Sequence, residues 1–188
     1  MTLHDLRASL PDYAKDLRLN LESVLSEHGA PGLGAARIAM VALASAIASR
    51  HEPLTRAVAE WAADVLDDAA LTATRSAASI MAMTNVYYRF THLVSDPEYQ
   101  NLRAGLRMNA LAQPGADKIG FELASLAVSA INGCGKCMDS HEKTLRHAGV
   151  DAPVVQNAVR IAAVIHAAAV TLEQAAAAAV TSRAQAAA

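Results

Sequence analysis

The chain has 188 residues, a length that suits one sizeable domain and is short for two ordinary ones. Hydrophobic residues make up 53% of the chain and aromatic residues only 4%, so Ala, Leu, Val and Ile must form most of a large core. The net charge of -2 and the lack of a basic run exclude the electrostatic pattern of a nucleic-acid-binding protein. No stretch has the roughly 18 uninterrupted apolar residues of a membrane helix. The segment from Met1 to Asp16 lacks the apolar centre of a signal peptide, so we expect a cytoplasmic protein without a membrane partner.

Helical signals follow one another along the whole chain. Ala is the strongest helix former, and no segment shows a sustained alternation of apolar and polar residues. Helices are predicted within residues 1–30, beginning at Pro11, and then from Ala35 to Ser49, Pro53 to Asp67, Thr72 to Phe90, Asp117 to Ile131, Cys134 to Ala148, and Asp151 to Val180. The tail from Ala184 to Ala188 is predicted to fray. The sequence therefore predicts an all-α, compact multi-helix fold in one domain over residues 1–188.

A weak internal repeat with a shift of 84 residues suggests two related helical units. The shift places Ser129-Ala130-Ile131 on Ser45-Ala46-Ile47, Val150-Asp151 on Leu66-Asp67, and Ala162 on Ala78. The predicted first unit spans residues 35–95 and the second spans residues 117–182. Chance matches are frequent in an Ala-rich chain, so duplication and coincidence both remain open. In the first unit the residues aligned with Cys134, Cys137 and His141 are Arg50, Pro53 and Ala57, which would leave it without their chemistry.

The two cysteines of the chain lie three positions apart, in the motif Cys134-Gly135-Lys136-Cys137. In a reducing compartment this spacing indicates redox chemistry or metal binding more than a structural disulfide. Residues i and i+3 share one face of a helix, and the positive end of a helix dipole favours a thiolate over a thiol. Lys136 adds a positive charge that would stabilise a thiolate. The motif therefore predicts a reactive dithiol on the first turn of a helix.

Two further residues are predicted to belong to this site. His141 lies four residues after Cys137, one helical turn away, where its imidazole can accept and return the thiol proton. Glu122 lies in an apolar stretch of the preceding helix, where an unpaired carboxylate is costly. If the chain turns back after Gly133, Glu122 will approach His141 and orient it. A nucleophile, a base and an orienting group form the general pattern of an activated nucleophile.

Each of these residues also has a simpler interpretation. A zinc site would require two more ligands, and His141 and His147 give only the spacing C-x2-C-x3-H-x5-H, which lacks the long gap of a folded finger. We therefore predict no metal. His141 alone is compatible with an ordinary helical surface histidine, and Glu122 alone with a solvated residue beside Ser125 and Ser129. The helix dipole favours Cys134 as the more acidic thiol, whereas the spacing of His141 favours Cys137.

The pattern formed by Glu122, Cys134, Cys137 and His141 resembles that of the alkyl hydroperoxide reductase D family, within the wider carboxymuconolactone decarboxylase-like superfamily. The flanking segments Leu106-Arg107-Met108-Asn109, Phe121-Glu122-Leu123, Ala127 to Cys134 and Leu10 to Asp16 carry the same likeness. The C-x-x-C-x3-H core is common to the wider superfamily, whereas the flanks are similar to the D-type reductases. The resemblance covers essentially the whole chain.

The resemblance implies an all-helical homotrimer in which the dithiol reduces an oxidised C-type peroxiredoxin and, weakly, hydroperoxides. It implies that Cys137 attacks and passes through a sulfenic acid, and that Cys134 donates a proton and closes the Cys134–Cys137 disulfide. His141 and Glu122 would form a proton relay. No tightly bound cofactor is implied. Electrons would come from protein-bound dihydrolipoamide on a lipoylated acyltransferase, supplied by dihydrolipoamide dehydrogenase.

Lys136 is a departure from this family, whose best-known members have histidine at that position. Lysine stabilises a thiolate but transfers protons poorly near neutral pH, so the role of the family histidine does not carry over. Two other functions remain open: a non-enzymatic redox-sensing subunit and a decarboxylase-like lyase. A decarboxylation needs no dithiol, and a sensor needs no proton relay, so the residues favour the dithiol enzyme.

Overall fold

The computed structural model describes residues 2–186, without the side chains of 182–184 and 186. Its helices are α1 (Leu3–Ala8), the 3-10 helix η1 (Asp12–Ala14), α2 (Lys15–Val24), α3 (Ala35–Ser49), α4 (Glu52–Ala63), α5 (Asp68–Leu93), α6 (Glu98–Asn101), α7 (Asn109–Ala112), α8 (Lys118–Ile131), α9 (Gly135–His147) and α10 (Ala152–Ala186). No strand occurs between residues 2 and 186, so the predicted all-α fold is confirmed.

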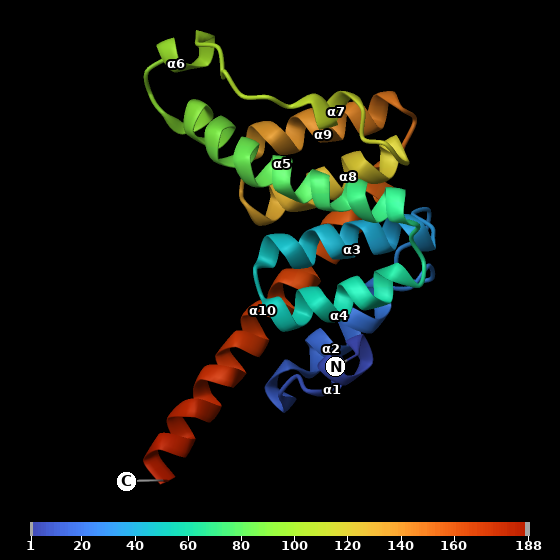
Figure 1. Ribbon diagram of the computed structural model, residues 1–188, viewed down its shortest axis with the longest axis vertical. Helices are drawn as coiled ribbons and strands as arrows, with labels where there is room; N and C mark the ends of the chain where they lie inside the picture. The colour runs from blue at the N-terminus through green and yellow to red at the C-terminus, as the bar shows by residue number, and fades with distance from the viewer. Residues whose placement is uncertain (1, 187–188) are drawn as a thin grey trace.

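Helices α3 and α8 lie at the centre of the molecule (Figure 1) and pack against each other. Both are apolar on most sides, which is the pattern of a buried helix, and α5 and α10 each pack against both of them. The approach of α8 to α3 is close at Gly120, because a Cβ added there would lie 2.6 Å from the sulfur of Met40. This contact fixes the position of α8, the helix that carries Glu122.

The start of α8 is held by Asp117. Its carboxylate accepts hydrogen bonds from the N–H of Ile119 and, at 2.6 Å, from Nε of Arg37 on α3. Burial raises the pKa of this carboxyl, but Arg37 and the N–H groups of Gly120 and Ile119 outweigh burial and hold the pKa below its ordinary value. The predicted helix start at Asp117 is confirmed.

The structure corrects several predicted helix bounds. The single N-terminal helix expected within residues 1–30 is replaced by α1, η1 and α2, because Pro11 and the turn before it separate Leu3–Ala8 from the rest. Asp67, predicted as the end of a helix, instead caps the start of α5 by accepting the N–H of Ala70. The short helices α6 and α7 were not predicted, since four residues are too few to show a helical period.

Helix α10 is longer than predicted. It continues past Val180 to Ala186, while residues 187 and 188 of the expected frayed tail lie outside the described part of the chain. Its first half packs against α2, α3 and α8 through fully buried residues such as Ile161 and Ile165, and its second half projects from the body (Figure 1). Within Ala152–Thr181 an 18-residue window of this helix reaches a mean hydropathy of 1.5, so this helix alone among the described segments meets the length and composition of a membrane span. Of the most apolar 18-residue window of this helix, 28% is buried inside the protein.

The helix bounds repeat with the shift found in the sequence. Moving α3 by 84 residues places it on 119–133, close to α8, and moving α4 places it on 136–147, close to α9. Helix α5 then begins at 152, where α10 begins. This correspondence is what a duplicated three-helix unit would give, and it supports the proposal of two related units at residues 35–95 and 117–182.

Candidate active site

A tight turn between α8 and α9 places both cysteines at the start of a helix. Gly133 adopts a positive φ of 67°, a conformation that glycine reaches without steric cost, and its N–H bonds to the carbonyl of Ala130. Cys134 is the N-cap of α9, and its sulfur accepts the N–H of Cys137 at 3.3 Å. The two cysteines form a disulfide, with 5.3 Å between their Cα atoms. The predicted placement of the motif on a first helical turn is confirmed.

The same turn brings Glu122 of α8 against His141 of α9. The carboxylate Oε2 lies 2.7 Å from Nδ1 of the imidazole, and both side chains are about nine-tenths buried. A carboxyl group at this depth is tolerated because the imidazole forms a hydrogen bond with it. The expected approach of Glu122 to His141 is therefore confirmed, although 19 residues separate them in the chain.

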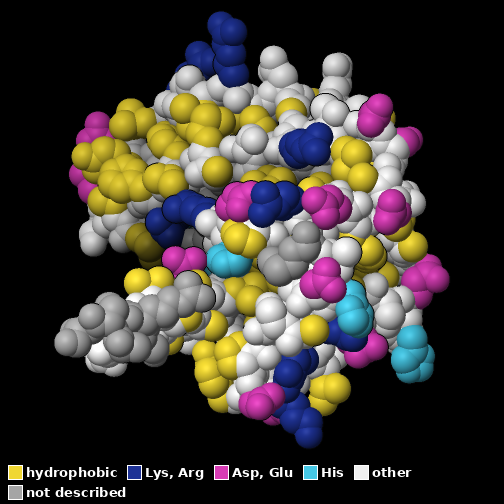
Figure 2. Space-filling view, turned by 60° about the horizontal axis from the view of Figure 1, so that its bottom comes forward, with side chains coloured by type: hydrophobic (Ala, Val, Ile, Leu, Met, Phe, Trp, Pro, Cys, Tyr) yellow, Lys and Arg dark blue, Asp and Glu magenta, His cyan; other side chains and the backbone are white. Residues whose placement is uncertain are grey.

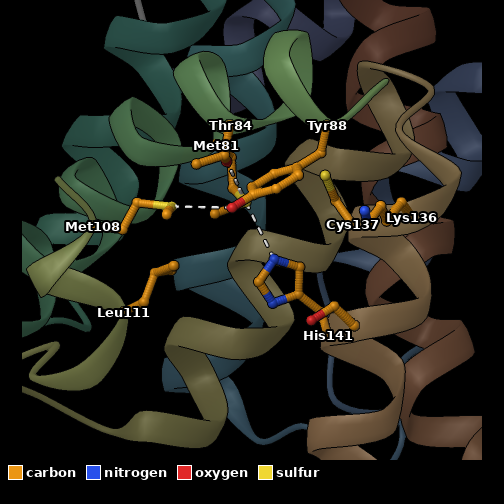
Figure 3. A pocket seen from close by; sticks show the side chains of 9 residues that line it. Met81, Thr84, Tyr88, Met108, Leu111, Lys136, Cys137 and His141 are labelled. Atoms are coloured by element: carbon orange, nitrogen blue, oxygen red, sulfur yellow. Dashed lines mark hydrogen bonds between the residues drawn. The ribbon is translucent and has the colours of Figure 1, made fainter. Parts of the chain in front are cut away.

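A cavity of about 250 Å³ opens beside the disulfide (Figure 3). Cys137 and His141 lie on one wall, from α9, while α5 and the α7 segment form the opposite wall. The full lining consists of Met81, Thr84, Tyr88, Met108, Leu111, Lys136, Cys137, Ser140 and His141. Cys134 does not line the cavity and is fully buried, so Cys137 is the sulfur that faces it.

Lys136 lies at the rim of this cavity. Its ammonium is 5.5 Å from the centre of the Tyr88 ring, a cation–π distance. No carboxylate among the described residues forms an ion pair with it, so its charge is available to an anion in the cavity. The position is compatible with the predicted stabilisation of a thiolate.

The opposite wall was not predicted from the sequence. Met81, Thr84, Asn85 and Tyr88 follow one another at helical spacing on α5 and form a stripe of mixed polarity. Buried Thr84 and Asn85 within that stripe are the signal that marks it, because polar residues at core positions need specific partners. The described residues contain no group of three or more His, Cys, Asp or Glu side chains arranged to hold a metal ion.

Relatives with similar sequences match this chain over nearly its whole length. An alkyl hydroperoxide reductase AhpD from Streptomyces avermitilis is 54% identical over 173 residues, covering 92% of this chain and 96% of the relative. The AhpD of Frankia alni is 55% identical, with 92% of each chain covered, and that of Coxiella burnetii is 54% identical, with 87% and 93% covered. The chain belongs to the AhpD family.

A match to the carboxymuconolactone decarboxylase family covers residues 97–181, the part that contains the disulfide, His141 and Glu122. This AhpD-family chain thus has its cysteine motif inside the region shared with the wider superfamily. The residues of α5 that form the opposite wall of the cavity lie outside that matched region. The cavity is therefore built jointly by the region matched to the superfamily and by a helix that precedes it.

Proposed function

We propose that the protein is an antioxidant dithiol oxidoreductase. Its main partner is an oxidised C-type peroxiredoxin, which it reduces, and it also reduces hydroperoxides weakly. The observation that carries this proposal is the Cys134–Cys137 disulfide beside a cavity whose wall also holds the His141–Glu122 pair. A reversible dithiol, an adjacent base and an orienting carboxylate are the parts that thiol–peroxide chemistry requires. Membership of the AhpD family supports the same reaction class.

Cys137 is proposed as the attacking thiol and Cys134 as the resolving thiol. Of the two sulfurs only that of Cys137 borders the cavity, and a substrate must reach the sulfur that attacks it. Cys134 is the N-cap, where the first N–H groups of α9 stabilise its thiolate form. A resolving thiol has to ionise, but it does not have to meet the substrate, so its burial is compatible with this role.

The proposed oxidation has two steps. The Cys137 thiolate attacks the terminal oxygen of a hydroperoxide, the O–O bond breaks, and the alkoxide leaves as an alcohol after it gains a proton. Cys137 is then a sulfenic acid, which the Cys134 sulfur attacks to release water and form the disulfide. His141 supplies and recovers the protons, while Glu122 holds its ring and compensates its charge. Lys136 at the rim stabilises the thiolate between these steps.

Re-reduction is proposed to use protein-bound dihydrolipoamide, carried by a lipoylated acyltransferase and regenerated by dihydrolipoamide dehydrogenase. The dithiol of the donor attacks the protein disulfide through a mixed disulfide and leaves as a cyclic disulfide. The cavity supports this donor because its walls are largely apolar, with Met81, Met108 and Leu111 beside Cys137. No tightly bound cofactor is needed for either half of the cycle.

A cytoplasmic homotrimer is proposed as the working form. Large hydrophobic side chains are exposed at the end of α5, with Val86 exposed by 61% and Leu93 by 71%, and Val180 on α10 is exposed by 68%. Figure 2 shows hydrophobic side chains gathered broadly over one side of the face that it presents. Large hydrophobic side chains that gather on a protein surface are typical of a protein interface. Sedimentation equilibrium is expected to give three chains per particle, and a clean monomer would contradict the proposal.

The proposed function is tested by NADH consumption with dihydrolipoamide dehydrogenase, a lipoylated protein and a hydroperoxide, with and without a C-type peroxiredoxin. We expect lipoyl-dependent turnover that peroxiredoxin stimulates and that Cys137→Ser abolishes. Full turnover in Cys137→Ser would contradict the proposal. Thiols that titrate without any lipoyl-dependent turnover would favour a redox-sensing subunit, and release of carbon dioxide from a carboxylated substrate would favour a lyase.

A further inference from the structure

The thioether of Met81 is the second partner of the His141 ring. Its sulfur lies 3.2 Å from Nε2, on the side of the imidazole opposite to the Glu122 contact at Nδ1. Met81 is 2% exposed and lies 60 residues away from His141 in the chain, on α5 (Figure 3). Both nitrogens of the imidazole are therefore held, one by a carboxylate and one by a sulfur.

The chemistry of this contact locates a proton. A thioether has no hydrogen to donate and accepts only weakly, so a contact of 3.2 Å with an unprotonated Nε2 would oppose two lone pairs. The contact is attractive when Nε2 carries a hydrogen and donates it to the sulfur. This holds whether the proton shared between Nδ1 and Glu122 lies on the imidazole or on the carboxyl group.

Polar side chains surround the Met81 sulfur. The hydroxyls of Ser129 and Thr84 lie 3.5 Å and 3.6 Å from it, although each donates its hydrogen to a backbone carbonyl one turn earlier, at 2.8 Å and 2.9 Å. The amide nitrogen of Asn85 lies 3.7 Å from the sulfur and has a hydrogen to direct at it. Asn85 donates to Ser129 at 3.0 Å, and its oxygen accepts from Asn132 at 3.0 Å, which fixes the orientation of its amide. The Met81 sulfur therefore lies in a polar part of the core, beside an amide of fixed orientation and the imidazole of His141.

We propose that Met81 is a positioning residue that holds the Nε2–H of His141 while the cysteines are oxidised. In the disulfide neither cysteine sulfur is charged, and Met81 is the acceptor that the structure offers to Nε2–H. After reduction the Cys137 thiolate, on the same cavity wall, is a far stronger acceptor and takes over the hydrogen bond. The weakness of the sulfur acceptor is useful, because it releases the proton readily.

This change of acceptor, from Met81 to Cys137, takes place in the second half of disulfide reduction. The inference rests on the proposed role of His141 in the proton relay. The first thiolate of a donor dithiol attacks Cys137, the protein S–S bond breaks, and Cys134 receives its electron pair. The second donor thiolate then attacks the sulfur of the mixed disulfide that belongs to the donor, and Cys137 leaves as a thiolate. The Nε2 proton moves from its contact with Met81 to Cys137, and the proton lost by the donor's second thiol restores His141.

Nitrogen-15 and proton NMR of His141 tests this directly, with dithiothreitol as the reductant, so that the result does not depend on lipoyl chemistry. In the oxidised wild type we expect a protected Nε2–H signal with a nuclear Overhauser contact to the Met81 methyl group, and we expect that contact to be lost on reduction. An oxidised protein whose Nε2 carries no proton, or a contact that persists unchanged after reduction, would overturn the proposal. This measurement requires no substitution and therefore no assumption about folding of a variant.

Substitutions test the proposal through the rate of disulfide reduction. Met81→Leu keeps the volume but removes the acceptor, so reduction of the disulfide by dithiothreitol should slow about threefold to tenfold and the Nε2–H signal should lose its protection. Met81→Gln, which restores an acceptor, should recover both the rate of disulfide reduction and the protection of the Nε2–H signal. Met83→Leu is the matched control, because Met83 lies on the same helix but does not line the cavity. Equal rates in Met81→Leu and wild type, or equal slowing in Met83→Leu, would overturn the proposal.

Discussion

Glu122 and His141 meet at 2.7 Å between Oε2 and Nδ1 because the turn at Gly133 folds α9 back against α8. The pair lies beneath the cavity that Cys137 faces, so a proton at the imidazole is available to the reacting sulfur. Burial of both side chains makes the pair interdependent, since either group alone would be an uncompensated polar group in the core.

Removal of the carboxylate charge tests this pair. Glu122→Gln keeps an oxygen that can accept the Nδ1 hydrogen but loses the negative charge, so lipoyl-dependent turnover should fall about tenfold to a hundredfold. Circular dichroism should show a retained helical fold. Ser125→Ala, one turn further along α8 and also buried, is the control and should keep most of the activity. Wild-type turnover in Glu122→Gln would show that the carboxylate has no role in the relay.

The charge at the rim of the cavity is tested by Lys136→Met. Loss of the ammonium removes thiolate stabilisation, so alkylation of the reduced Cys137 by iodoacetamide near pH 7 should slow about twofold to fivefold. Lys136 is exposed, and the difference from wild type should therefore shrink at high salt. Lys143→Met, on the same helix but outside the cavity lining, should leave the alkylation rate unchanged. Equal slowing in both variants would assign the effect to net charge instead of position.

The ion pair between Asp117 and Arg37 predicts a loss of stability in acid. The pKa of Asp117 is lowered in the folded state. Its contribution to the free energy of unfolding is therefore complete above the unfolded pKa of about 3.9 and is lost as pH falls through the folded pKa. Asp117→Asn keeps a helix cap and should cost about 0.5–1 kcal/mol at pH 7, whereas Asp117→Ala also loses the cap and should cost about 1–2 kcal/mol. Urea unfolding should show the Asp117→Asn difference narrowing toward about pH 3. A difference that does not change with pH would exclude the ion pair as its cause.

The turn that brings the site together is tested at Gly133. No atom lies within 4 Å of a Cβ added there, so Gly133→Ala should be destabilising only through the positive φ, by about 1 kcal/mol in urea unfolding. Gly135→Ala is a matched control two residues away, where added atoms also meet open space but φ is not positive. It should be neutral or stabilise α9 slightly. Equal loss of stability in both variants would contradict the argument from backbone conformation.

The central residues of the site were predictable from the sequence, either because they lie close together in the chain or because burial of a charged group would be costly without a partner. Cys134, Cys137 and His141 share one helix face at spacings of three and four residues, and Glu122 was identifiable as a carboxylate in an apolar helix. Met81, Tyr88 and the α7 segment were not predictable, because they reach the site only through the tertiary packing of α5 against α8 and α9. The short helices α6 and α7 were missed for a different reason, since their few residues carry no periodic signal.

The most direct test of the account is to trap the oxidised thiol in single-cysteine variants. Reduced Cys134→Ser is treated with one equivalent of a hydroperoxide and then with dimedone, which reacts with sulfenic acids, and the labelled site is located by mass spectrometry. We expect dimedone on Cys137 in this variant and no label on Cys134 in Cys137→Ser, because only Cys137 faces the cavity. A label on Cys134 in the second variant, or none on Cys137 in the first, would contradict the central claim.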